Sequence, residues 1–188
     1  MSLRRLLWVG ALALAALFTS GCTGLPDKVQ PVSGFELNRY LGTWYEIARL
    51  DHSFERGLSQ VSAQYSLRDD GGVRVINRGF DAAKGEWKQA EGKAYFVGAS
   101  DTGHLKVSFF GPFYGTYAVF DLDKDGYQHA FVSGPNTDYL WLLARTPTVS
   151  PALKKRFVAM AQESGFDTGG LIWVEQTQRA AKDPAKVQ

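Results

Sequence analysis

The chain has 188 residues, of which 45% are hydrophobic and 21% charged, and this composition suits one globular domain with a hydrophobic core. Two of its 21 basic residues fall in the first five positions, so 19 Lys and Arg face 19 Asp and Glu beyond residue 21. A balanced charge without a basic cluster excludes a nucleic-acid-binding footprint, and we expect no nucleic-acid partner.

The first 22 residues have the pattern of an export signal that ends in a lipid anchor. A basic start precedes an apolar run over residues 6–18, which is shorter than the roughly 20 residues that a membrane-spanning helix needs. Cys22, the only cysteine, follows small residues in the manner of a bacterial lipobox. We therefore expect residues 1–21 to be a lipoprotein signal peptide and Cys22 to become the lipidated N-terminus. The alternative is ordinary cleavage near Gly21, which yields a soluble product.

The residues after Cys22 predict where the protein is held. Several acyl chains hold a protein firmly at a membrane, whereas a single chain does so only marginally. Thr23, in place of Asp, is typical of Gram-negative lipoproteins that are sent to the outer membrane. We expect a lipid-anchored protein of the outer membrane that faces the periplasm. Residues 22–33 are expected to form a lipidated tether without regular structure, since Pro26 and Pro31 fall within them.

From about residue 34 onward, short runs and turn signals indicate β-structure. The clearest strand is 59–68, where apolar and polar residues alternate with period 2, and residues 69–72 then form a hairpin turn. Gly92 suggests a bulge within its strand. We expect eight strands in all, at residues 43–50, 59–68, 73–80, 87–97, 105–110, 115–122, 127–133 and 139–144.

Residues 150–165 predict one helix, and residues 171–174 a short final strand. Ser150 is a good N-cap, Pro151 suits the first helical position and Gly165 ends the helix. The apolar residues of this segment fall on one stripe, so we expect the helix to pack against the outside of the β-domain.

The expected fold class is all-β, an eight-stranded antiparallel up-and-down barrel over residues 34–176, followed by a polar C-terminal tail over residues 177–188. Closing the sheet into a barrel removes its exposed edges. A barrel of eight strands is wide enough to hold one small ligand, and the 13% aromatic content suits the lining of such a cavity.

Trp44 and Arg145 predict how one end of the barrel closes. Gly42 and Trp44 open the first strand, where a large aromatic side chain can plug the barrel, although an ordinary core tryptophan explains it too. Tyr139, Trp141 and Arg145 have the same parity and share a strand face. If Arg145 turns inward onto Trp44, then Tyr139 and Trp141 line the cavity as ligand-binding residues. An Arg–indole stack contributes about 0.5–2 kcal/mol.

The order of these motifs resembles that of the lipocalin family. Residues 42–49 resemble the first lipocalin motif, Thr137, Asp138 and Tyr139 the second, and Arg145 the third. Several further runs are similar to the bacterial outer-membrane lipoproteins of the apolipoprotein D-like branch: residues 54–57, 65–72, 106–115, 145–147 and 172–174.

The resemblance implies a binding protein that is not an enzyme. It implies that fatty acids or lysophospholipids are bound in the barrel, for lipid storage or transport in the maintenance of the cell envelope. It also implies that a homodimer can form, and we expect no cofactor.

An aromatic cluster surrounds the turn at residues 111–112. It consists of Phe109, Phe110, Phe113 and Tyr114, which are candidates for a hydrophobic rim that touches ligand, membrane or a second subunit, because exposed apolar patches often mark such sites. The alternative is a loop that packs on its own barrel.

Patterns for metal binding or catalysis are weak. Residues 121–126 resemble the start of an EF-hand loop, but Val132 stands where the bidentate Glu belongs, so a hairpin turn explains them better. His52, His104 and His129 have no metal-ligand spacing, and we expect them on the surface or in loops and expect no metal site. The sequence also has no nucleophile elbow, P-loop or dinucleotide fingerprint.

The leading hypothesis is a lipid-anchored carrier of single-chain lipids. Two alternatives are a structural lipoprotein that binds a partner instead of a ligand, and a lipid-modifying enzyme with its active site in the cavity. The enzyme is disfavoured because no constellation of acid, base and nucleophile is recognisable.

Overall fold

The computed structural model describes residues 23–176, so the predicted signal peptide, Cys22 and the predicted C-terminal tail lie outside the described residues. The helical segments in this range are α1 (Leu37–Tyr40), α2 (Pro151–Glu163) and the 3-10 turn η2 (Thr168–Gly170). The strands are β1 (Gly42–Arg49), β2 (Leu58–Leu67), β3 (Val73–Asp81), β4 (Glu86–Phe96), β5 (His104–Phe110), β6 (Phe113–Leu122), β7 (His129–Ser133), β8 (Leu140–Ala144) and β9 (Ile172–Trp173). No helix in the described part of the chain is long and apolar enough to span a membrane.

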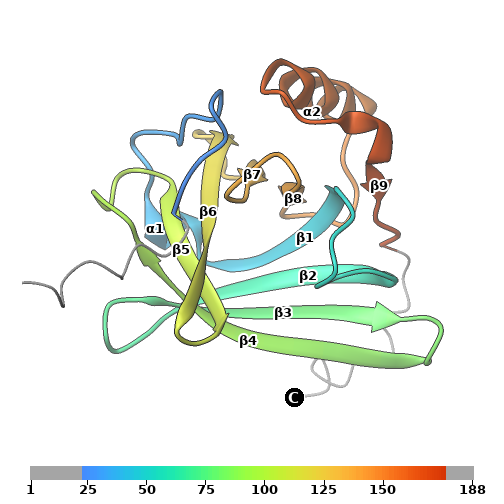
Figure 1. Ribbon diagram of the computed structural model, residues 1–188, viewed down its shortest axis with the longest axis horizontal. Coiled ribbons are helices and arrows are strands. Elements are labelled where there is room, and N and C mark those ends of the chain that lie inside the picture. Colours follow the sequence, from blue (N-terminus) through green and yellow to red (C-terminus); the bar gives the residue numbers. More distant parts are fainter. Residues whose placement is uncertain (1–22, 177–188) are drawn as a thin grey trace, which may run out of the picture.

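Within these residues, β1 to β8 close into an antiparallel barrel (Figure 1). Each strand pairs with the next along the chain, and β8 returns to pair with β1. The predicted eight-stranded up-and-down barrel is confirmed, and the strand bounds differ from the predicted ones by no more than two residues.

Three local predictions are wrong. The β-pattern expected from residue 34 onward is interrupted by α1, and β7 begins at His129 because Tyr127 adopts a positive φ of 53°. Gly92 does not form a bulge, since it pairs in continuous register with Val75. A Cβ at Gly92 would lie 2.7 Å from the carbonyl oxygen of Ser108, so glycine is needed there for the close approach of β5.

Residues 23–32 form no helix or strand, in agreement with the predicted lack of regular structure, but the segment packs against the barrel instead of standing free of it. Val29 is buried in an apolar cluster, and the backbone N–H of Val32 donates to a carbonyl of β6 at 2.8 Å. Thr116 Oγ1 donates to the carbonyl oxygen of Gly24 at 2.8 Å. Prolines occur in extended chain segments whether the segment is free or packed against a sheet, so Pro26 and Pro31 do not distinguish the two cases.

Apolar side chains form one cluster inside the barrel and another outside it. The inner cluster surrounds Trp44. The outer cluster lies between the wall and α2, whose Phe157 and Ala161 are fully buried. Ser150 accepts a hydrogen bond from the N–H of Leu153 at 3.2 Å, so the helix begins as predicted. Figure 1 shows α2 packed outside the barrel.

The C-terminal residues 172–176 complete the wall between β1 and β2. These two strands pair with each other only along Gly42–Tyr45 of β1, and farther along β1 the partner is β9. Gln176 Nε2 bridges the remaining gap, because it donates to the carbonyl oxygens of Glu46 at 2.7 Å and Val61 at 2.8 Å.

Candidate functional site

The direction of the strands defines two ends of the barrel. β1 starts beside Trp44, at what we call the closed end. Because consecutive strands are antiparallel, the connections at the opposite end, which we call the open end, follow β1, β3, β5 and β7. These connections span residues 50–57, 82–85, 111–112 and 134–139.

Trp44 plugs the closed end. Its side chain is fully buried, and its indole N–H donates to the carbonyl oxygen of Tyr40 at 2.7 Å. The guanidinium carbon of Arg145 lies 4.0 Å from the centroid of the Trp44 ring, so the stack expected from strand parity is present. Gly42 has a φ of +95°, and a Cβ there would come within 3.4 Å of Arg145 Nη1. A glycine at this position is therefore needed for the backbone and for the stack.

Arg145 also ties together three separate backbone segments. Its guanidinium donates to the carbonyl oxygens of Arg39 at 2.7 Å, Thr43 at 3.0 Å and Tyr127 at 3.2 Å. A planar guanidinium presents its donors in a fixed fork, which lysine cannot reproduce. The closed end is therefore held by one side chain that stacks on the plug and joins α1, β1 and the β6–β7 connection.

A chain of three tyrosine hydroxyls lies next to the plug. Tyr117 Oη is 2.7 Å from Tyr40 Oη and 3.0 Å from Tyr65 Oη. Burial raises the pKa of each of these phenols well above its ordinary value, so all three remain neutral. This network was not predicted from the sequence. Tyr65 does fall at an inward position of the predicted strand 59–68.

Inward-facing side chains nearer the open end remain partly exposed to water. They pack against the inner cluster without being buried, in contrast with Trp44. The members from this half of the strands are Val107, Phe109 and Trp141. These side chains give the open half of the barrel an inner face that is apolar and largely aromatic.

Tyr139 and Trp141 lie together at the open end, as their shared parity predicts. Their rings are nearly parallel with centroids 6.1 Å apart. The ring of His52, from the connection after β1, lies 5.7 Å from that of Tyr139 and 5.2 Å from that of Trp141. His52 lies in a loop, as one of the two predicted alternatives has it, but its side chain is only 6% exposed. The β1–β2 connection therefore folds against the inward-facing aromatics.

A buried cluster of charged side chains joins the same connection to the barrel wall. Arg49 Nη1 donates to Glu46 Oε1 at 2.7 Å, and both side chains are almost fully buried. The indole N–H of Trp141 donates to Glu55 Oε2 at 3.1 Å, and His52 Nε2 lies 3.0 Å from the same oxygen. No sequence pattern indicated this cluster, because its members come from a strand and from a connection without periodicity.

The two carboxyl groups of the cluster differ in their pKa. Burial, together with the nearby carboxylate of Glu55, raises the pKa of Glu46 well above its ordinary value, and Arg49 opposes this only in part. Burial also acts against ionisation of Glu55, but its contacts with His52, Glu46 and Trp141 leave its pKa below the ordinary value. Of the two carboxyl groups, Glu46 is therefore the one that loses its proton at the higher pH.

The residues of the second sequence motif do not all face the interior. Thr137 and Asp138 are exposed in the β7–β8 connection, where the N–H of Asp138 donates to Asn136 Oδ1 at 2.9 Å. Only Tyr139 of this motif reaches the aromatic group at the open end.

The residues of the predicted aromatic rim do not lie together, because each has different neighbours. Phe109 packs with the inner cluster, whereas Phe113 is 78% exposed at the tip of the β5–β6 hairpin. Tyr114 lies against Lys106, whose Nζ is 5.2 Å from its ring centroid, and against the ring of Tyr95.

The segment that resembles an EF-hand loop forms a hairpin turn, as expected. The carboxylate of Asp123 accepts hydrogen bonds from the N–H groups of Gly126 and Gln128, and Asp121 pairs with Arg156 at 2.6 Å. Within residues 23–176, no three His, Cys, Asp or Glu side chains are grouped so that they could hold a metal ion.

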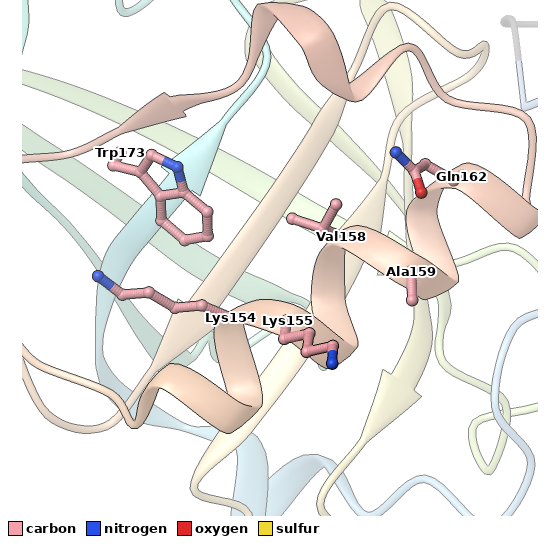
Figure 2. A pocket seen from close by; sticks show the side chains of 6 residues that line it. All are labelled: Lys154, Lys155, Val158, Ala159, Gln162 and Trp173. Atoms are coloured by element: carbon pink, nitrogen blue, oxygen red, sulfur yellow. The ribbon is translucent and has the colours of Figure 1, made fainter.

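A groove of about 440 Å³ lies outside the barrel, between α2 and β9 (Figure 2). It is lined by Lys154, Lys155, Val158, Ala159, Gln162 and Trp173. Lys154 Nζ lies 4.9 Å from the Trp173 ring centroid, which leaves the groove with an aromatic and cationic side. None of its lining residues faces the barrel interior, so this groove is a separate surface feature.

Comparison with known proteins gives one consistent family. The lipocalin-like domain matches residues 35–176. Over 165 residues the chain is 64% identical to the outer membrane lipoprotein Blc of Vibrio cholerae, covering 88% of this chain and 96% of that protein. Over 174 residues it is 55% identical to the outer membrane lipoprotein Blc of Escherichia coli strain K12, covering 92% and 98%. The fold matches insecticyanin from the tobacco hornworm Manduca sexta with a TM-score of 0.62 at 21% identity, over 82% of this chain and 88% of that one.

Proposed function

The chain belongs to the lipocalin family, and on this premise we propose that it is a lipid-anchored carrier of single-chain lipids in the outer membrane. Lipocalins bind small hydrophobic ligands, and the homologues of this chain are binding proteins rather than enzymes. The proposed cargo is a fatty acid or a lysophospholipid, and the proposed role is lipid storage or transport in the maintenance of the envelope.

The partly exposed apolar inner face of the open half is the observation that supports this proposal. Trp44 seals one end, while inward-facing side chains such as Phe109 and Trp141 keep accessible surface toward the other end. A blind apolar interior of this kind suits one alkyl chain. About twelve buried methylenes would give a gross gain of about 10 kcal/mol. Since association entropy removes much of this gain, we expect a Kd that is micromolar or tighter.

The polar groups at the open end suit a ligand whose headgroup stays near water. His52 and Tyr139 lie beside Trp141 at this end, and the Glu55 carboxylate is engaged by the indole N–H. Ligand pockets combine a mostly apolar lining with a few placed polar groups that fix orientation. We propose that the alkyl chain points toward Trp44 and the headgroup toward His52 and Tyr139.

Anchoring through Cys22 is part of the proposal. The support is the lipobox-like pattern before Cys22, together with the relatives from Vibrio cholerae and Escherichia coli, which are named outer membrane lipoproteins. We propose that residues 1–21 are removed, that Cys22 carries the lipid and that the barrel faces the periplasm.

Two other uses of the same fold are open to test. A partner-binding lipoprotein would leave the interior without lipid, and a homodimer would cover exposed apolar surface at the open end. A lipid-modifying enzyme would turn over the bound lipid.

Equilibrium titration of the mature chain carrying Cys22→Ser tests the carrier function. The probes are palmitate and a palmitoyl lysophospholipid, followed by calorimetry below their critical micelle concentrations. One lipid per chain with micromolar or tighter affinity is the expected result. Absence of saturable binding of either lipid would contradict the carrier, and release of free fatty acid from the lysophospholipid would favour the enzyme.

A further inference from the structure

The start of the folded part of the chain fixes where an anchor at Cys22 can lie. Gly24 accepts a hydrogen bond from Thr116 on β6, and the side chain of Val29 is buried a few residues later. Cys22 precedes Gly24 by two residues, and consecutive Cα atoms are 3.8 Å apart, so an anchor at Cys22 would be joined to Gly24 by no more than about 8 Å of chain. An anchored barrel is therefore held directly at the membrane, with β6 near it.

The apolar tip of the β5–β6 hairpin is close to this attachment point. Phe113 begins β6 three residues before Thr116, which corresponds to about 10 Å along the strand. Among the large hydrophobic side chains of the described residues, Phe113 and Phe110 are the most exposed, at 78% and 74%. Phe110 and Phe113 are paired across the hairpin, so the two exposed rings belong to one tip.

The sequence around this exposed tip contains no charged residues. Residues 107–120 contain no Asp, Glu, Lys, Arg or His, although 21% of the whole chain is charged. A charge carried into a bilayer has a large desolvation cost, whereas aromatic side chains favour the interface between headgroups and acyl chains. An exposed aromatic tip whose own residues carry no charge is thus suited to insertion at a membrane surface, and the nearest described cation, Lys106 against Tyr114, suits the anionic headgroups there.

From this placement we propose that the β5–β6 tip docks into the surface of the bilayer that holds the Cys22 anchor. The tip lies at the open end of the barrel, so docking brings that end to the membrane. A single-chain lipid then passes between bilayer and barrel without crossing bulk water. This inference rests on the proposed lipidation of Cys22 and adds an orientation that anchoring alone does not give.

Site-specific labelling of the lipidated protein tests the orientation. The thiol of Cys22, the only cysteine, is consumed in the anchor, so Phe110→Cys offers one site for an environment-sensitive fluorophore. Leu67→Cys is the matched control, because Leu67 is 56% exposed but lies at the closed end. In phospholipid vesicles we expect a blue shift, with quenching by bromine-labelled acyl chains, at residue 110 and neither at residue 67.

Flotation of the labelled proteins with the vesicles separates the premise from the inference. Protein that does not float contradicts the anchor and the orientation together. Protein that floats with a water-exposed label at residue 110 contradicts the orientation alone. The same label is also measured in the Cys22→Ser background without vesicles. A blue shift at residue 110 that grows with protein concentration would show that the tip contacts a second copy of the chain, and this result would overturn the proposal.

Lipid transfer provides a second readout. Phe110→Asp places a charge on the tip, so we expect the anchored variant to take a fluorescent lysophospholipid from vesicles severalfold more slowly, with its equilibrium affinity unchanged. Leu67→Asp serves as the control and should transfer lipid at the original rate. Equal rates for the two variants would contradict docking of the tip.

Discussion

The indole N–H of Trp141 donates to Glu55 Oε2 at 3.1 Å, and this bond joins the wall of the barrel to the connection that follows β1. Trp141 also packs on the inner apolar cluster while part of its surface remains exposed. One side chain therefore belongs to the proposed lining of the lipid site and also holds the β1–β2 connection in place.

Trp141→Ala is expected to weaken binding of palmitate or lysophospholipid by about tenfold or more, since about 1.4 kcal/mol of lost contact corresponds to tenfold in Kd. The lost hydrogen bond to Glu55 should lower the free energy of unfolding by about 1–3 kcal/mol, so the protein stays folded. Calorimetric titration and urea unfolding measure the two effects. Trp173→Ala, on the outer groove, is the control and should bind lipid normally. Unchanged affinity in Trp141→Ala would remove this residue from the site.

Arg145→Ala should lower the free energy of unfolding by about 2–4 kcal/mol, because it removes the stack on Trp44 and three hydrogen bonds to backbone carbonyls. Urea unfolding followed by tryptophan fluorescence measures the change. Arg74→Ala removes an exposed pair with Glu91 and should lower the free energy of unfolding much less than Arg145→Ala does. Similar losses for the two variants would show that Arg145 does not hold the closed end.

Glu46→Gln should change how stability depends on pH. The pKa of Glu46 is raised by folding, so its contribution to stability is complete below its ordinary value of 4.5 and is lost as pH rises through the folded pKa. The variant should therefore gain stability relative to the parent between pH 5 and 8, by up to about 1.4 kcal/mol per pH unit. Urea unfolding at several pH values provides the comparison.

Glu91→Gln is the matched control of opposite sign. The hydrogen bond from Arg74 lowers the pKa of the exposed Glu91. The contribution of Glu91 to the stability of the fold is therefore present above its ordinary pKa and is lost as pH falls. This variant should become slightly less stable than the parent toward neutral pH. A Glu46→Gln difference that stays constant from pH 5 to 8 would contradict the raised pKa of Glu46.

Gln176→Ala should loosen the seam between β1 and β2, because the side-chain amide bridges carbonyl groups of both strands. We expect a loss of about 1–2 kcal/mol in unfolding free energy, with faster hydrogen exchange in residues 46–49 and 58–61. Gln162→Ala, on an exposed helix position, should affect neither quantity. Unaltered exchange at the seam would show that β9 closes it without help from Gln176.

The barrel and its plug could be predicted from the sequence because both follow from alternation. Period-2 patterns and turn residues located the strands, and parity placed Arg145 over Trp44 before any contact was known. The tether was misjudged because composition does not reveal that Val29 has an apolar surface to cover.

The buried charged cluster could not be predicted, because a register shift hides it. Strict alternation from Trp44 and Glu46 would turn Arg49 to the outside. The pairing of β1 with β8 shifts between Glu46 and Ala48, after which Arg49 pairs with Trp141 and faces inward. His52 and Glu55 then reach the same place from a connection whose path no periodicity describes.

Native mass spectrometry of the lipidated protein, isolated from its own outer membrane in a mild detergent, tests the carrier function most directly. The account predicts one fatty acid or lysophospholipid per chain, which dissociates on collisional activation and is depleted in Trp141→Ala. A barrel that is isolated without lipid and remains so after incubation with palmitate and lysophospholipid would contradict it.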